Sequence, residues 1–138
     1  METKKITIHT TVSVNIQKAW EYYTQPEHIT KWNFATDEWQ CPYASNDLRV
    51  GGKYMARMEA KDGSFGFDFE GIYDEVIDSE KIIYTMSDGR QVTVSFESAD
   101  SQTEVTVTFD AESTNDLEIQ RQGWQAILEN YKRYTEAS

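Results

Sequence analysis

The chain of 138 residues contains little cysteine, since Cys41 is the only one. A single cysteine excludes an intramolecular disulfide framework and any metal site built from several thiolates. Zinc requires three or four His, Cys or carboxylate ligands at short spacings, whereas His9, His28 and Cys41 lie far apart in the sequence. We therefore expect no metal ion and no cofactor, a structural hydrogen bond for His28, and a buried or incidental thiol at Cys41.

The chain also lacks long hydrophobic runs. No unbroken apolar stretch exceeds three residues, as in 126–128, so none is long enough to span a bilayer. The first five residues are polar or charged apart from Met1, and they lead directly into an alternating pattern, without the apolar segment of a secretory signal peptide. These absences favour a cytoplasmic protein that is not inserted into a membrane.

Positive charge is scarce. Thirteen Lys and Arg residues stand against 24 Asp and Glu residues, which gives a formal net charge of −11. Such a chain repels phosphate backbones and anionic membranes unless its basic residues form a patch, and only Lys4-Lys5 and Lys132-Arg133 are close together. We therefore expect no nucleic-acid partner. The acidic surface either aids solubility or meets a basic surface on another protein.

Aromatic residues, in contrast, are abundant. Four Trp, eight Tyr and six Phe residues make up 13% of the chain and are spread along its length. So many aromatic side chains need a folded interior, which argues against disorder. No linker, low-complexity tract or internal repeat interrupts the sequence, so we assign residues 1–138 to a single domain.

The first part of the chain predicts a strand followed by helices. Residues 6–14 alternate apolar and polar side chains, as a strand with one buried face does. Asn15 can then cap a helix that carries Trp20 and Tyr23 on one side. Pro26 either ends this helix or opens a second short one. Residues 33–47 are rich in aromatics but show no regular period.

The central part predicts a series of short strands. Glycines mark the turns between them, and Gly71 interrupts one segment, which indicates a bulge or a sharp bend. Because every link is short, an antiparallel meander is favoured over parallel crossovers. The alternating segments cover residues 54–58, 65–70, 82–86, 92–96 and 105–109.

The end of the chain predicts one long helix. Apolar residues between positions 117 and 134 recur at spacings of three and four, which gives about five turns, with Thr114 or Asn115 as the cap. The fold class is therefore α+β, with a curved antiparallel sheet of about six or seven strands wrapped around a long C-terminal helix and two short helices after the first strand. Gly123 either lets this helix approach the sheet closely or leaves room beside Trp124.

We predict a ligand-binding cavity on the concave side of the sheet, because one helix cannot fill the hollow of a long curled sheet. Plain core packing accounts for most of the aromatic and methionine residues there, and the architecture favours a pocket for some of them. The strands and the long helix contribute Tyr54, Met58, Phe67, Phe69, Tyr84, Met86, Phe96, Trp124, Leu128 and Tyr131, and the segment around the second helix contributes Trp32, Phe34 and Trp39 as a mouth or lid.

No catalytic residue is assigned. Asp68 and Glu70 alternate with phenylalanines, so their side chains point to the solvated face of the sheet. Tyr54, Tyr73 and Tyr84 could present a phenol to a carbonyl group, although a core tyrosine that is hydrogen-bonded to a neighbour is commoner. Acid–base catalysis by a polar residue in the cavity therefore stays open as an alternative.

Four segments resemble the family named for the activator of the heat-shock-protein-90 ATPase. The first runs WEYYTQPEHITKW from Trp20 to Trp32, with Thr-x-Pro-Glu-His and a Trp four residues beyond the His. Further matches follow in order, at 47–52, 70–76 and Gly123-Trp124. The chain departs from the family pattern at Asn33, where many relatives have a second Trp, and at Met86, where an aromatic residue is common.

The resemblance implies the helix-grip fold of the START-like superfamily. Many members bind an apolar small molecule between the sheet and the long helix, so we expect a hydrophobic or amphipathic small molecule as the partner. Members that dock on the chaperone suggest a protein-binding domain as the first alternative. An enzyme of the polyketide cyclase/dehydratase type is the second alternative.

Overall fold

A computed structural model describes residues 4–112 and 116–138. Seven strands form one sheet in the order β1-β7-β6-β5-β4-β3-β2, and every neighbouring pair is antiparallel. The expected α+β class is confirmed. The elements are β1 (Lys5–Val12), α1 (Ile16–Thr24), α2 (Pro26–Trp32), β2 (Trp39–Asn46), β3 (Lys53–Ala60), β4 (Gly66–Ile77), β5 (Lys81–Met86), β6 (Gln91–Ala99), β7 (Gln102–Asp110) and α3 (Leu117–Ala137).

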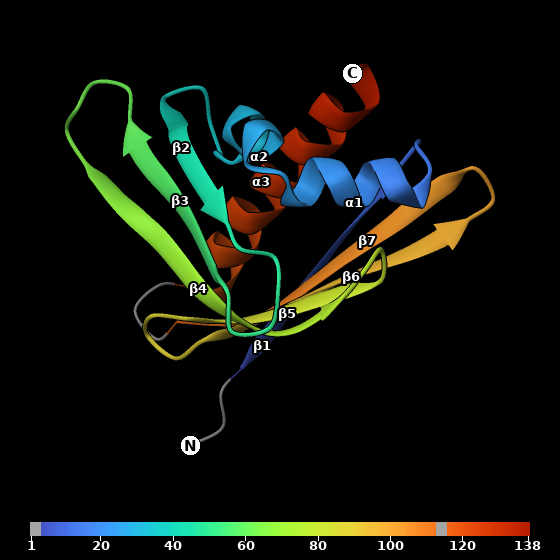
Figure 1. Ribbon diagram of the computed structural model, residues 1–138. Coiled ribbons are helices and arrows are strands. Elements are labelled where there is room, and N and C mark those ends of the chain that lie inside the picture. The colour runs from blue at the N-terminus through green and yellow to red at the C-terminus, as the bar shows by residue number, and fades with distance from the viewer. Residues whose placement is uncertain (1–3, 113–115) are drawn as a thin grey trace.

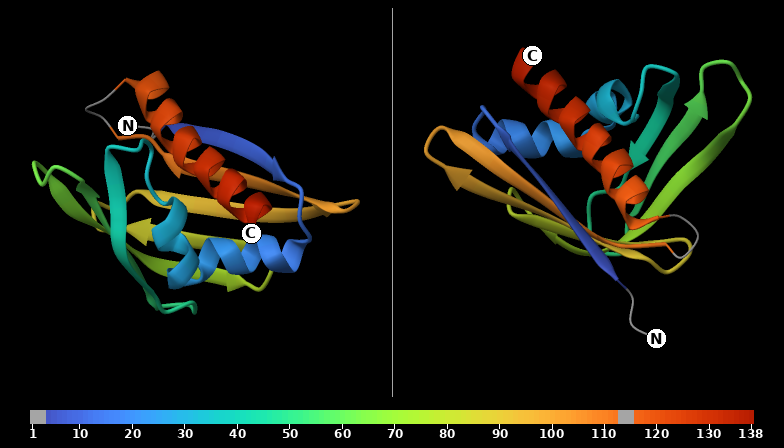
Figure 2. Two further views of the ribbon diagram at one scale, coloured as in Figure 1. Left: turned by 90° about the horizontal axis from the view of Figure 1, so that it is seen from above. Right: turned by 180° about the vertical axis from the view of Figure 1, so that it is seen from behind.

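The sheet curls around α3, which crosses its concave side at a slant (Figure 1). Helices α1 and α2 lie beside the C-terminal half of α3, so the three helices cover the same face of the sheet (Figure 2). No helix in the described ranges is long and apolar enough to cross a membrane.

Capping residues set the helix starts. The Asn15 side chain accepts a hydrogen bond from the Lys18 backbone N–H at 2.9 Å, which confirms the predicted cap of α1. Pro26 opens α2, in the first helical position where its missing N–H costs no hydrogen bond. For α3 the cap is Asp116, whose carboxylate accepts from the Glu118 N–H at 2.8 Å. The expected caps Thr114 and Asn115 lie outside the described residues.

Two local features differ from what the sequence pattern indicates. The irregular segment 33–47 contains a strand, β2, whose pairing with β3 shifts register between Gln40 and Tyr43. This irregularity breaks the two-residue period, so the sequence pattern hid the strand. Gly71 sits in regular pairing, and the register break of β4 lies between Tyr73 and Glu75 instead. The glycine serves a close approach, because a Cβ at position 71 would lie 2.6 Å from the Tyr84 ring.

The tightest packing lies where β1, β6 and β7 meet α1 and the C-terminal half of α3. Valines from these strands and Tyr131 of α3 are fully buried there. Trp20 of α1 packs edge-on against Phe96, with ring centroids 5.2 Å apart. This region is the hydrophobic core that holds α3 on the sheet.

Candidate functional site

A cavity of about 570 Å³ lies between the sheet and the N-terminal half of α3. Helix α3 rests on β1, α1 and α2, and it stands off from the far strands of the curled sheet. Gly123 of α3 lines the cavity, and, apart from its chain neighbours and the backbone of its own helix, no atom lies within 4 Å of the position its Cβ would occupy. Of the two roles considered for Gly123, close approach to the sheet is therefore wrong, and the glycine leaves space.

Nine of the thirteen residues expected at the cavity line it. The cavity wall that they form is mainly aromatic. Trp124 stacks on Phe109 with ring centroids 3.9 Å apart and a 10° interplanar angle, and Phe69 meets Trp124 edge-on at 6.2 Å. The stack fixes the indole of Trp124 beside the open space. The nine residues are Trp32, Tyr54, Met58, Phe67, Phe69, Tyr84, Met86, Trp124 and Leu128.

Phe96 and Tyr131 do not line the cavity and belong to the packed core. Phe96 is 4% exposed and Tyr131 is fully buried. The Tyr131 hydroxyl donates to the Ala19 carbonyl at 2.6 Å, which ties α3 to α1. Strand parity placed Phe96 on the concave face correctly, and helical spacing placed Tyr131 on the side of α3 that faces the sheet, but α1 fills the space in front of both side chains.

The three residues expected to form a mouth or lid of the cavity do not come together. They are Trp32, Phe34 and Trp39. Trp32 is buried and lines the inner part of the cavity, held by a hydrogen bond from its Nε1 to the Tyr22 carbonyl at 2.9 Å. Phe34 is outside the cavity lining, and its carbonyl accepts from Asn130 at 2.7 Å. Trp39 starts β2 at the sheet edge and packs edge-on against exposed Phe65 at 6.1 Å. Trp39 does not line the cavity, but its ring meets the lining residue Phe67 edge-on at 6.3 Å.

Four tyrosines gather at the α1 side of the cavity: Tyr23, Tyr54, Tyr73 and Tyr84 all line it. The Tyr73 hydroxyl donates to Asn46 Oδ1 at 2.7 Å, and the Tyr54 hydroxyl accepts from Asn33 Nδ2 at 3.2 Å. Burial raises the pKa of each phenol, and the nearby phenols add to the rise for Tyr23, Tyr54 and Tyr84. All four hydroxyls are therefore protonated at neutral pH.

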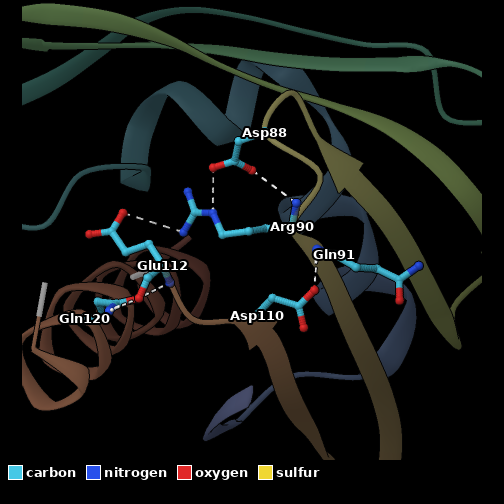
Figure 3. Close-up of polar contacts among 6 residues, drawn as sticks. All are labelled: Asp88, Arg90, Gln91, Asp110, Glu112 and Gln120. Atoms are coloured by element: carbon cyan, nitrogen blue, oxygen red, sulfur yellow. Dashed lines mark hydrogen bonds and ion pairs between the residues drawn. The ribbon is translucent and has the colours of Figure 1, made fainter. Parts of the chain in front are cut away.

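The opposite end of the cavity is charged (Figure 3). Arg90, after the β5–β6 turn, pairs through Nε with Asp88 at 2.7 Å and through Nη1 with Glu112 at 3.7 Å. Glu112 is joined to α3, because its backbone N–H donates to Gln120 Oε1 at 2.9 Å and its carbonyl accepts from Gln120 Nε2 at 3.2 Å. These contacts fix the start of α3 against the end of β7. Just behind them, the Gln91 N–H donates to Asp110 Oδ2 at 2.9 Å.

The charged end carries more negative than positive charge. Arg90 is the single cation among the described lining residues, and it faces two carboxylates. Burial opposes ionisation of Asp88, but hydrogen bonds from the Arg90 backbone and guanidinium, together with its charge, lower the pKa of the carboxyl below its ordinary value. Asp88 therefore stays ionised at neutral pH and holds Arg90.

Sequence reasoning missed Tyr23, Asn33, Arg90 and Glu112 as lining residues. Tyr23 was assigned only to a helix face, and Asn33 was noted only as a departure from a pattern. Arg90 and Glu112 are 22 positions apart in sequence, and the β6–β7 hairpin brings them together. The glycine turn between the predicted strands 82–86 and 92–96 was the one available pointer to this end.

A family model described as activator of Hsp90 ATPase homolog 1-like protein matches residues 13–136. The chain belongs to this family. The AHSA1-like protein from Aeromonas hydrophila is 41% identical, with a TM-score of 0.91 over 97% of this chain and 93% of that chain. A protein from Cytophaga hutchinsonii is 47% identical, with a TM-score of 0.84 over 96% of this chain and 92% of that chain. No match was found among curated proteins.

More distant structures share the fold. A protein from Chromobacterium violaceum is 21% identical, with a TM-score of 0.86 over 96% of this chain and 98% of that chain. The AHSA1-like assignment and these structures agree with the helix-grip architecture expected from the four sequence segments. The first of these segments includes α2, where His28 Nδ1 lies 2.8 Å from the Tyr134 hydroxyl and the His28 ring stacks on Tyr22 at 3.8 Å. The expected structural hydrogen bond of His28 is confirmed.

Cys41 lies in β2 and is buried. Burial raises the pKa of its thiol to about 11, although hydrogen bonding to the Tyr43 backbone and to the Asn33 side chain works in the other direction. The thiol is therefore protonated and unreactive at neutral pH. Among the described residues, no three His, Cys, Asp or Glu side chains are grouped so that they could hold a metal ion.

Proposed function

We propose that this AHSA1-like protein binds a hydrophobic or amphipathic small molecule in the cavity between the sheet and α3. The observation that carries the proposal is the cavity itself, whose volume of about 570 Å³ falls within the range of small-molecule sites. Its walls are mainly aromatic, aliphatic and methionine side chains, and its polar groups belong to the tyrosine cluster, to the charged end and to Asp68 and Glu70 of β4.

The two ends limit the length of the ligand. Tyr23 contacts Tyr131 of α3, with ring centroids 5.0 Å apart, whereas the charged end contacts Gln120. Eleven residues of helix separate these two points, which is about 16 Å along the axis. A ligand of two to four fused or linked rings, or a chain of similar length, would occupy this distance.

The proposal is tested by thermal unfolding with flavonoids, sterols, aromatic polyketides and fatty acids. A ligand at 100 times its dissociation constant stabilises the fold by about 2.7 kcal/mol, which raises the midpoint by several degrees in a domain of this size. The informative variant is Met86→Lys, which adds a charge to the cavity wall. Its matched control is Ile72→Lys, on an exposed β4 residue that does not line the cavity.

A midpoint shift that is lost in Met86→Lys and kept in Ile72→Lys would support the cavity as the binding site. A shift that survives in folded Met86→Lys would place the ligand elsewhere. No shift with any class would remove the support for a small-molecule function and favour a protein partner.

The second candidate is a protein-binding domain that contacts a heat-shock-protein-90 chaperone. It is favoured by the name of the matched family and by the exposed aromatic side chains of Phe65 and Phe67 beside Trp39. Phe65→Ser should weaken binding to the purified chaperone, and Met86→Lys should leave it unchanged. Equal binding by Phe65→Ser and the unmodified protein would contradict a contact at this site.

A further inference from the structure

We propose that Tyr23 and Tyr84 form a pair of hydrogen-bond donors that holds an acceptor oxygen of a neutral ligand, such as a ketone carbonyl. This inference rests on the proposed function and names the chemistry that the cavity recognises. It follows from the hydrogen bonds that each phenol of the four-tyrosine cluster makes within the protein.

The hydroxyls of the cluster are not equivalent. The Tyr73 hydroxyl donates to Asn46 Oδ1 at 2.7 Å. The Tyr54 hydroxyl accepts from Asn33 Nδ2 at 3.2 Å, so its oxygen already has a protein partner, although this hydrogen bond does not use the Tyr54 proton. Tyr23 and Tyr84 make no hydrogen bond through their hydroxyls within the described part of the chain, although Tyr84 is only 7% exposed. A buried hydroxyl without a partner is costly, and native proteins rarely leave one without a use.

The two unpaired hydroxyls face the same space. Both tyrosines line the cavity. Thr135 Oγ1 is the one fully buried side-chain nitrogen or oxygen atom without a hydrogen-bond partner among the described residues, so the Tyr23 and Tyr84 oxygens are not of this kind. Each of the two phenols is near enough to its neighbours in the cluster to be affected by their charge. We place a small acceptor atom in this shared space, within reach of both hydroxyls.

The ring positions are fixed, so the donors are preorganised. Tyr23 is held edge-on between Phe96 at 5.6 Å and Tyr131 at 5.0 Å. Tyr84 packs against Tyr54 at 5.8 Å and against Tyr73 at 6.0 Å. Rigid donors lose little conformational entropy when a ligand binds, which favours affinity.

Protonation decides which acceptor suits the pair. Burial raises the pKa of both phenols, so they remain neutral donors across the physiological range. A carboxylate ligand would instead need a cation to offset its desolvation, and Arg90 is already paired with Asp88 and Glu112. The cavity therefore favours a neutral carbonyl compound over an organic anion of the same shape.

The test compares 9-fluorenone, fluorene and fluorene-9-carboxylate, which share one ring system, by titration of tryptophan fluorescence. In the unmodified protein, fluorenone should bind at least about two- to tenfold more tightly than fluorene, which is the range expected for one net hydrogen bond. Tyr84→Phe and Tyr23→Phe should each lower this ratio toward one without weakening fluorene. The carboxylate should bind less tightly than fluorenone.

Tyr73→Phe is the matched control, because its hydroxyl already serves Asn46. It should leave the fluorenone-to-fluorene ratio unchanged. If fluorene and fluorenone bind equally to the unmodified protein, the donor pair is refuted while the cavity function stands. If Tyr73→Phe lowers the ratio as much as Tyr84→Phe, or if the carboxylate binds most tightly, the assignment is likewise overturned. Binding of none of the three compounds would overturn the inference together with the proposed function.

Discussion

Strands β1, β6 and β7 present valine and phenylalanine side chains that α1 and α3 seal, whereas β3 and β4 present aromatic side chains that face open space. Val94, Val105 and Phe109 are almost completely buried in the first region. In the second region Tyr54 and Phe69 are half-buried and line the cavity. Both regions belong to one continuous sheet, so the difference comes from what lies across from each.

The position of the helices explains this difference. Helix α3 contacts β1 and α1, and α1 adds contacts to β6 and β7, so that side of the sheet is covered by two helices. The β3–β4 side faces only the glycine-containing stretch of α3, where Gly123 leaves room. The aromatic side chains there are packed on one side and open to the cavity on the other, and this is why they can form a binding surface.

The same substitution in each region should give the largest contrast. Phe96→Ala removes a ring that packs against Trp20 and Tyr23, and it should lower the free energy of unfolding by about 3–5 kcal/mol. Phe69→Ala removes a half-buried ring beside an existing cavity, so about 1–2 kcal/mol should be lost. Urea unfolding measures both values. Equal losses would mean that the cavity side is packed as tightly as the core.

Two glycines sharpen the comparison at the level of single atoms. Gly71→Ala should destabilise the protein by about 1–3 kcal/mol, because the new Cβ would lie 2.6 Å from the Tyr84 ring. Gly123→Ala should stabilise it by about 0.5–1 kcal/mol, since nothing lies within 4 Å and alanine favours a helix. Chemical unfolding of the two variants checks the opposite signs. Destabilisation by Gly123→Ala would show that α3 closes on the sheet at this position.

These glycines also show what the sequence could predict. The alternating and helical periods were sufficient for the order of strands and helices, because those periods reflect which face is buried. The β2 strand escaped because its pairing is irregular between Gln40 and Tyr43. The role of Gly71 escaped because the ring it accommodates belongs to Tyr84, thirteen positions away in the neighbouring strand.

The site was harder to predict than the fold. Parity indicates which side of the sheet a residue faces, and it placed Met58, Phe69 and Tyr84 correctly on the concave side. Neither strand parity nor helical spacing indicates whether another helix fills the space in front, which is why Phe96 and Tyr131 were included although they belong to the core. Hydrogen-bond partners such as Asn46 for Tyr73 depend on three-dimensional contacts between distant segments.

Two tyrosines of the cluster should differ in stability when their hydroxyls are removed. Tyr73→Phe should lower the free energy of unfolding by about 1–2 kcal/mol, because it leaves Asn46 Oδ1 without its donor. Tyr84→Phe should change it by less than about 0.5 kcal/mol, because no hydrogen bond is lost. Urea unfolding without ligand measures both. A loss for Tyr84→Phe as large as that for Tyr73→Phe would reveal an acceptor for Tyr84 within the protein.

The smallest effect is expected at the charged end. Asp88→Asn keeps one oxygen, which can still accept from the Arg90 backbone N–H, and it removes the charge together with the oxygen that accepts from Arg90 Nε. The Asp88 side chain is half exposed, so at pH 7 the loss should be at most about 1 kcal/mol. Because folding lowers the pKa of this carboxyl, its contribution is present above the unfolded pKa of about 4 and is lost as the pH falls through the lower folded value. Urea unfolding at pH 7 and near pH 2 should therefore show a difference between the two proteins that vanishes in acid, and also in 1 M salt. A difference that persists at both extremes would mean that the Asp88 side chain acts through its hydrogen bonds and not through its charge.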